Sequence, residues 1–279
     1  MSTERADHHL PGRAEPKLLV SVRNVGEARA ALSGGCDILD IKEPTRGSLG
    51  MADTPTIAAV LSAVSALSNN QSPVPVSAAL GEVHHWTADQ RLPRVPTGLR
   101  FVKLGPADLN ASDWTEHWRA VRARFDALWK GRRAPHWIAV IYADWKSARA
   151  PRPAQIIEAA GRFECAGVLF DTHGKGRGTL LDFVPPDELA DLVGRIQTAG
   201  MLAAVAGRIR IESLPALVAA RPDVLAIRTA GCRDDNRNGP LCENRIREFK
   251  SALRASFAET AAYADDWRTS TPRESSPAD

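Results

Sequence analysis

The chain has 279 residues, of which 44% are hydrophobic and 25% are charged, and its formal net charge is +3. These values are typical of a globular protein with one large domain or two small ones. The small charge does not indicate a nucleic-acid partner, and the arginines are scattered along the chain rather than gathered on one face, so we expect none. The sequence has no run of about 18 apolar residues, and residues 1–17 lack the apolar core of a signal peptide, so we expect no membrane span and a cytoplasmic location.

Eight short apolar runs recur along the chain, and segments with helical signals separate them. Runs without strict alternation of apolar and polar residues are typical of strands that are covered on both faces, as in parallel sheets. In chain order the runs are 18–22, 37–42, 74–80, 100–105, 137–144, 167–172, 202–209 and 224–231.

Several of the intervening segments carry residues that start or stop helices. Asn24 is a typical N-cap, and Thr54 precedes a proline that suits a first helical turn. Pro186 opens a helix that Gly200 closes. The third unit differs, because residues 81–99 contain prolines and little apolar periodicity. We expect a long loop there with at most a short helix.

Eight strand–helix units over about 240 residues predict a single-domain α/β protein with the (β/α)8 TIM-barrel fold. A doubly wound parallel sheet is the alternative. We place the barrel at residues 17–262. Residues 1–16 and 263–279 are polar and rich in serine and proline, and we predict that both tails are disordered.

Charged residues fall near the C-terminal ends of the predicted strands. Side chains of a barrel strand alternate between the interior and the helix layer. If Leu39 and Ile41 face the helices, Asp40 and Lys42 face the interior. The same alternation places Lys103 inside, with Val102 and Leu104 outside. Enzymes of this fold carry their chemistry on this face of the barrel.

Further polar residues end three other runs. Asp171 lies at the predicted mouth, next to His173, a candidate proton carrier, and Lys175 follows on a glycine-rich loop that can reach the same mouth. Tyr142 and Asp144 end the fifth run. Each charge taken alone also fits a solvated strand end or an ion pair, but their gathering on one rim favours an active site.

Two lysines on one rim indicate a Schiff-base mechanism. A lysine attacks a carbonyl only when it is unprotonated, and its usual pKa is near 10.4. Burial and a neighbouring ammonium both favour the neutral amine. One lysine can therefore form the imine while the second transfers protons. We expect Asp40 to hold the amine in position and Asp171 to act in acid–base steps.

The loops after the seventh and eighth runs predict a phosphate site. Many barrels bind phosphate there through backbone N–H groups and a helix N-terminus. Gly207 and Gly231 allow close approach of the backbone, and Arg208, Arg228 and Arg233 supply positive charge. The favoured substrate class is a sugar or triose phosphate.

No metal or cofactor is expected. The cysteines are far apart and lack the usual spacing of zinc ligands, so we interpret them as free thiols. His84 and His85 are adjacent in a loop, and neighbouring residues seldom bind one metal unaided. The four cysteines are Cys36, Cys165, Cys232 and Cys242.

The sequence resembles the (5-formylfuran-3-yl)methyl phosphate synthases, also called 4-(hydroxymethyl)-2-furancarboxaldehyde-phosphate synthases. The likeness covers about residues 17–250 in colinear order, and the segments that carry it are "DIKEP…GSLG", "FVKLG", "YAD", "FDT", "AGRI" and "RTAGCRDDNRNG". The resemblance implies a (β/α)8 lyase that condenses two molecules of glyceraldehyde 3-phosphate. It also implies loss of phosphate and water and a phosphorylated furan aldehyde as product, a precursor of methanofuran or an analogue.

The resemblance also implies roles for individual residues. Lys42 matches the Schiff-base lysine and Lys103 the proton acceptor. Asp40, Asp171 and Lys175 match further acidic and basic positions of the family's active site.

Two other functions remain open from the residues alone. A lysine-dependent aldolase or isomerase of triose phosphates would use the same rim but stop before a furan forms. A non-catalytic barrel that binds a phosphorylated ligand would form no imine. In each case the expected partner is a triose phosphate rather than nucleic acid or membrane, and a homo-oligomer is compatible with all three functions.

Overall fold

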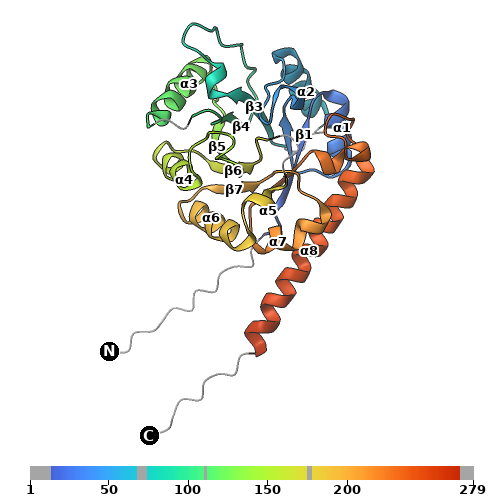
Figure 1. The fold of residues 1–279 in the computed structure, drawn as a ribbon. Helices are drawn as coiled ribbons and strands as arrows, with labels where there is room; N and C mark the ends of the chain where they lie inside the picture. The colour runs from blue at the N-terminus through green and yellow to red at the C-terminus, as the bar shows by residue number, and fades with distance from the viewer. Residues whose placement is uncertain (1–13, 68–73, 110–111, 175–177, 271–279) are drawn as a thin grey trace, which may run out of the picture.

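The computed structural model describes residues 14–67, 74–109, 112–174 and 178–270 (Figure 1). Eight parallel strands close into a barrel in sequence order. Closure is made by β8 pairing with β1, where Lys17 lies opposite Val224, so the open doubly wound sheet is excluded and the (β/α)8 prediction is confirmed. The strands are β1 (Lys17–Val22), β2 (Ile38–Ile41), β3 (Val76–Glu82), β4 (Phe101–Gly105), β5 (His136–Tyr142), β6 (Gly167–Asp171), β7 (Leu202–Val205) and β8 (Val224–Ile227).

Helices surround the barrel and begin near the predicted residues. The Asn24 side chain accepts a hydrogen bond from the backbone N–H of Glu27 at 2.9 Å, and Pro186 opens its helix as expected. No helix in the described part of the chain is long and apolar enough to cross a membrane. The helices are α1 (Val25–Ser33), α2 (Thr54–Leu67), α3 (Trp114–Leu128), α4 (Pro153–Arg162), α5 (Leu180–Phe183), α6 (Pro186–Thr198), α7 (Leu214–Ala219) and α8 (Glu243–Ser270).

The connection from β3 to β4 contains only a short 3-10 helix, Val83–His85, as the prolines predicted. The Arg124 guanidinium of α3 holds the rest of this loop. It donates to the carbonyl oxygens of Trp86 at 3.0 Å and Thr87 at 2.9 Å, and also to that of Gln90. One side chain thus fixes the loop where other units of the barrel use a packed helix.

The alternation of side chains follows the sequence prediction. Leu39, Ile41 and Val102 belong to the hydrophobic cluster between the strands and the helices. Ile38 belongs instead to a smaller cluster inside the barrel, together with Leu169 and several alanines. Because many interior residues are small, the barrel has room for long polar side chains nearer its C-terminal end.

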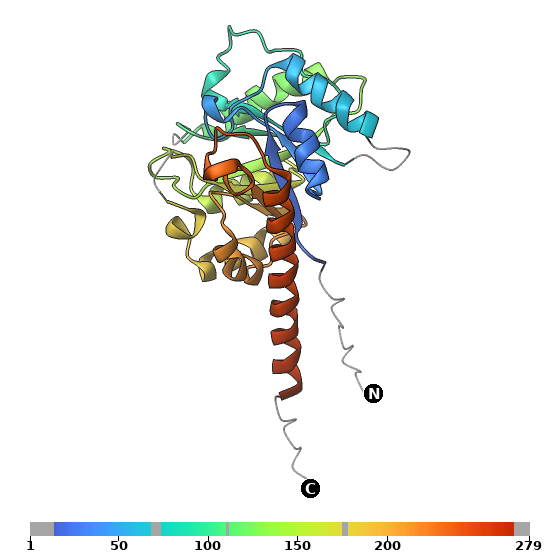
Figure 2. The same cartoon turned by 90° about the vertical axis from the view of Figure 1, so that its right-hand side faces the viewer.

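The last helix anchors the chain to the barrel and then extends beyond it (Figure 2). Ile246, Phe249 and Leu253 of α8 are at most 1% exposed. The Lys250 Nζ donates to Asp37 Oδ2 at 2.5 Å.

Residues 263–270, which the sequence analysis placed in the C-terminal tail, are helical because α8 continues to Ser270. The alanines that precede them favour helix and allow it to extend past the packed region. The remaining parts of the predicted tails, residues 1–13 and 271–279, lie outside the described residues.

Replacing Phe249 with alanine should lower the free energy of unfolding by about 3–5 kcal/mol, because it removes a fully buried ring that joins α8 to the core. The matched control is Tyr263→Ala on the same helix, where the side chain is 79% exposed and the change should stay within about 0.5 kcal/mol. Urea unfolding followed by circular dichroism measures both. Equal losses of unfolding free energy in the two variants would contradict a role of Phe249 in joining α8 to the core.

Candidate active site

The charged residues predicted for the mouth meet in one cavity at the C-terminal ends of the strands. Asp40, Lys42, Lys103 and Asp171 are between 1% and 7% exposed. The cavity has about 520 Å³ of empty space, including the part that is open to solvent. Its polar lining residues are Ser21, Asp40, Lys42, Lys103, Asp171, Arg208, Arg228, Thr229 and Arg237.

Lys103 and Asp40 form a tight buried pair. The Lys103 Nζ lies 2.5 Å from Asp40 Oδ1, and Ser21 Oγ donates to the other oxygen of Asp40 at 3.3 Å. Burial alone would raise the pKa of Asp40, but the charges of Lys103 and Lys42 and a hydrogen bond from Ser77 hold it below its usual value. The lowered pKa keeps Asp40 in its carboxylate form.

Asp40 was expected to hold the amine of Lys42, and the structure corrects this: its bonded partner is Lys103. The reason lies in the strands. Lys42 follows two residues after Asp40, one layer higher in the barrel, where its Nζ faces Asp171 of β6 instead.

The amine of Lys42 is the more loosely held of the two. Its Nζ is 3.7 Å from Asp171 Oδ2, which is longer than a hydrogen bond. Burial is the largest cause that lowers the pKa of Lys42, and Arg237 and Lys103 act in the same direction against Asp171 and Asp40. The shift has the direction that the sequence predicted, toward a neutral amine.

Asp171 offers one oxygen to the cavity. Its Oδ1 accepts the backbone N–H of Thr172 at 2.8 Å. Its Oδ2 is buried and has no hydrogen-bond partner within the described ranges. An unbonded carboxylate oxygen beside an amine is suited to accept a proton.

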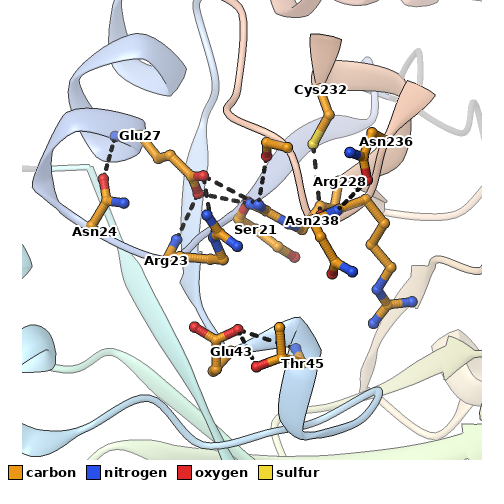
Figure 3. Close-up of polar contacts among 12 residues, drawn as sticks. Ser21, Arg23, Asn24, Glu27, Glu43, Thr45, Arg228, Cys232, Asn236 and Asn238 are labelled. Atoms are coloured by element: carbon orange, nitrogen blue, oxygen red, sulfur yellow. Dashed lines mark hydrogen bonds and ion pairs between the residues drawn. The ribbon is translucent and has the colours of Figure 1, made fainter. Parts of the chain in front are cut away.

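The loop after Lys42 ties β2 to β6. Glu43 N donates to Gly50 O at 2.8 Å, and a Cβ on Gly50 would lie 2.2 Å from Glu43 O, so only glycine fits there. Ser48 Oγ donates to Thr172 O, beside Asp171. The Glu43 carboxylate caps the turn through Thr45 (Figure 3). These bonds give residues of the "EPTRGSLG" segment a structural role, because they fix the position of Lys42 relative to Asp171.

Asp144 supports the loop after β6. This carboxylate is 5% exposed and accepts the backbone N–H groups of His173 at 2.8 Å and Gly174 at 2.7 Å. The His173 ring packs against Tyr142, with 4.9 Å between ring centroids. The predicted site residue Lys175 lies outside the described residues.

Two predicted phosphate residues line the cavity as expected, namely Gly207 and Arg208 after β7. Gly207 has φ +103°, and a Cβ there would be 3.0 Å from Thr172 Cγ2. Glycine is therefore required both by the backbone and by the space. Arg228 also lines the cavity, but its guanidinium makes a bidentate pair with Glu27 at 2.8 and 3.1 Å (Figure 3).

Two other residues proposed for phosphate binding lie elsewhere. Arg233 is exposed and is not among the residues that line the cavity. It begins the second of two 3-10 turns in this loop, Thr229–Gly231 and Arg233–Asp235. Gly231 is buried, and a Cβ there would meet Ile246 at 3.1 Å, so it serves the packing of α8.

Arg237 is the charged lining residue that sequence reasoning missed, beside the smaller polar residues Ser21 and Thr229. It lines the cavity, and its Nε and Nη2 are buried without a hydrogen-bond partner among the residues described. The only sequence signal is the "NRNG" turn, which does not distinguish Arg237 from Arg233 four residues earlier.

A second cavity, with about 1390 Å³ of empty space including the part that is open to solvent, opens at the opposite end of the barrel. Most of its wall is apolar, with Phe101, Leu202 and Val224 among the lining residues, and Lys103 lies at its inner end. This N-terminal face of a barrel usually serves stability. Within the described part of the chain, no three His, Cys, Asp or Glu side chains gather closely enough to hold a metal ion.

The cysteines are all free thiols. Burial is the main cause that raises the pKa of Cys36 to about 12 and that of Cys165 to about 11, and it also raises that of Cys232. Cys242 differs, since a hydrogen bond from the backbone N–H of Arg245 lowers its pKa.

The sequence model of one protein family, described as 4-HFC-P synthase, matches residues 18–250. The chain belongs to this family. A (5-formylfuran-3-yl)methyl phosphate synthase of Methanothermobacter thermautotrophicus is 31% identical over 245 residues, which cover 85% of this chain and 98% of that protein. The protein of the same name from Methanopyrus kandleri is 29% identical over 242 residues, 85% of this chain and 99% of its own length. The resemblance seen in the sequence is confirmed.

Solved structures with the same fold are more distant. Thiamine phosphate pyrophosphorylase from Pyrococcus furiosus has a TM-score of 0.54 and 13% identity, over 86% of this chain and 96% of that one. Phosphoribosyl anthranilate isomerase from Thermus thermophilus has a TM-score of 0.50 and 15% identity, over 88% and 99%. At these identities the likeness concerns the fold alone.

The substitution Asp40→Asn should lower the free energy of unfolding by about 3–5 kcal/mol, because it leaves the Lys103 ammonium buried without its carboxylate. The double variant Asp40→Leu, Lys103→Met should recover most of this loss. Urea unfolding at pH 7 measures both. Asp53→Asn, which breaks the exposed ion pair with Arg46, is the control and should change nothing measurable. A double variant as unstable as Asp40→Asn would contradict the role given to the pair.

Proposed function

We propose that the protein condenses two molecules of glyceraldehyde 3-phosphate through a Schiff base on Lys42. One observation carries this assignment. Of the two buried lysines in the cavity, Lys103 is held by a carboxylate at 2.5 Å, whereas Lys42 is 3.7 Å from its carboxylate and has a lowered pKa. The names of the relatives support a phosphorylated furan aldehyde as the product.

The first step makes the imine. The neutral Nζ of Lys42 adds to the aldehyde carbon of one triose, and water leaves. The iminium then withdraws electrons and acidifies the C–H bond next to it. Oδ2 of Asp171, 3.7 Å from Nζ, accepts that proton and leaves an enamine.

The second step joins the two trioses. The enamine carbon attacks the aldehyde carbon of the second molecule, and the new alkoxide takes a proton from the Lys103 ammonium, which Asp40 holds in place. Eliminations and ring closure follow, and water hydrolyses the C=N bond to free Lys42. The net release from the two trioses is one phosphate and two waters. Every loss is an elimination, so the reaction needs neither an oxidant nor a reductant.

The loops after β7 and β8 are suited to the substrate's phosphate. The backbone at Gly207 can approach an anion closely, and Arg208 adds positive charge. A phosphorylated furan aldehyde made here would serve the biosynthesis of methanofuran or an analogue.

Lys42→Arg should reduce turnover of glyceraldehyde 3-phosphate by at least about a thousandfold, because a guanidinium cannot supply a neutral nucleophile. Lys130→Arg, at an exposed lysine, should keep the wild-type rate. The ultraviolet absorbance of the furan measures turnover, and mass spectrometry after borohydride reduction locates the trapped triose. A trapped imine without a furan would indicate an aldolase or isomerase, and the absence of any adduct would indicate a binding protein.

The rate of borohydride trapping should rise with pH and level off below 10.5, the ordinary pKa of a lysine, because the pKa of Lys42 is lowered. The Asp171 carboxylate stabilises the ammonium form of Lys42, so Asp171→Asn should lower this pKa further and move the rise to lower pH. The pH profile of trapping, measured for the wild type and for Asp171→Asn, tests this expectation. A rise that moves to higher pH in the variant would contradict the assignment.

A further inference from the structure

The guanidinium of Arg237 has donors that no protein group satisfies within the described ranges. Its Nε and Nη2 are buried, and the side chain lines the same cavity as Lys42. A buried donor without an acceptor is costly, so such groups usually meet a ligand. An arginine offers two parallel N–H bonds, a geometry that matches the oxygens of a phosphate.

The guanidinium of the neighbouring Arg228, in contrast, has a protein acceptor for each of its N–H donors. Its Nη1 donates to Glu27 Oε2 at 2.8 Å and to Ser21 O at 2.9 Å, and its Nη2 donates to Glu27 Oε1 at 3.1 Å and to Gly239 O at 3.2 Å. Its Nε donates to Arg237 O at 2.9 Å. All five N–H groups are therefore used, and none is left for a substrate.

These bonds also decide where Arg237 lies. Arg228 is fixed to the barrel through Glu27 (Figure 3). It also holds the backbone of the β8 loop by donating to the carbonyl oxygens of Arg237 and Gly239. Within this loop, the Asn236 side chain accepts the backbone N–H of Asn238 at 3.0 Å and closes a tight turn around Arg237. The buried pair thus acts as a support for the loop.

We propose that Arg237 binds the phosphate of the triose that Lys42 carries as an imine, and that Arg228 is a positioning residue that holds Arg237 toward the cavity. The inference rests on the proposed function. Gly207 and Arg208 line the same cavity from the β7 loop, so a phosphate beside Arg237 would meet both loops. The positive charge of Arg237 is also among the causes that lower the pKa of Lys42, which agrees with their nearness.

The test compares two aldehydes, glyceraldehyde 3-phosphate and unphosphorylated glyceraldehyde, in borohydride trapping on Lys42 at limiting concentration. Arg237→Gln should reduce the preference for the phosphorylated aldehyde at least tenfold. The ratio of the two rates is the readout, because any change in the pKa of Lys42 affects both aldehydes alike. Arg233→Gln is the matched control on the same loop, where the arginine is exposed, and it should keep the wild-type ratio.

Inorganic phosphate provides a second measurement. It should compete with glyceraldehyde 3-phosphate for trapping by the wild type and by Arg233→Gln, and lose at least tenfold in potency against Arg237→Gln. Arg228→Lys keeps a positive charge beside Glu27 but cannot hold Arg237 O and Gly239 O at once. It should reduce the preference ratio while its thermal unfolding remains cooperative.

The outcomes separate the two proposals. If Arg237→Gln keeps both the preference and the competition by phosphate, Arg237 does not bind the phosphate. If Arg228→Lys keeps the wild-type ratio, its positioning role is overturned. If the wild type traps neither aldehyde on Lys42, the proposed function itself has failed.

Discussion

Two lysine side chains share one buried barrel mouth, and the carboxylates are divided unequally between them. Removing a charge from water is costly, so each amine must be paired or neutral. Asp40 lies one layer below Lys42 and satisfies Lys103, whereas Asp171 stays at 3.7 Å from Lys42. This inequality gives the two amines different surroundings, because Lys103 is bonded to a carboxylate whereas Lys42 lies beyond hydrogen-bond distance of Asp171.

The loops of the mouth keep that inequality in place, and three of them are held by the hydrogen bonds of a buried polar side chain. Ser48 joins the β2 loop to the end of β6, Asp144 receives two N–H groups of the β6 loop, and Arg228 fixes the β8 loop. Strand ends alone would leave these segments free to vary. Hydrogen bonds to the backbone give them one conformation, as a site that must align several groups requires.

The sequence was sufficient for the parts of the fold that repeat. Strand count and the inward direction of Lys42 and Lys103 follow from periodic patterns, and the missing third helix follows from prolines. The partner of Asp40 was not predictable, because it depends on how strands are staggered around the barrel. The choice of Arg237 over Arg233 was not predictable either. It depends on Asp234 and Asp235, whose positive φ values of 54° and 50° turn the loop.

Burial acts on the thiols by the same physics but with the opposite chemical result. In both groups the apolar surroundings favour the uncharged form, which is reactive for an amine and inert for a thiol. Cys36 and Cys165, with pKa values of about 12 and 11, therefore stay protonated. For the proposed aldehyde substrate, the core thiols are therefore poor competitors of an uncharged amine, because a thiol adds far less readily than a thiolate.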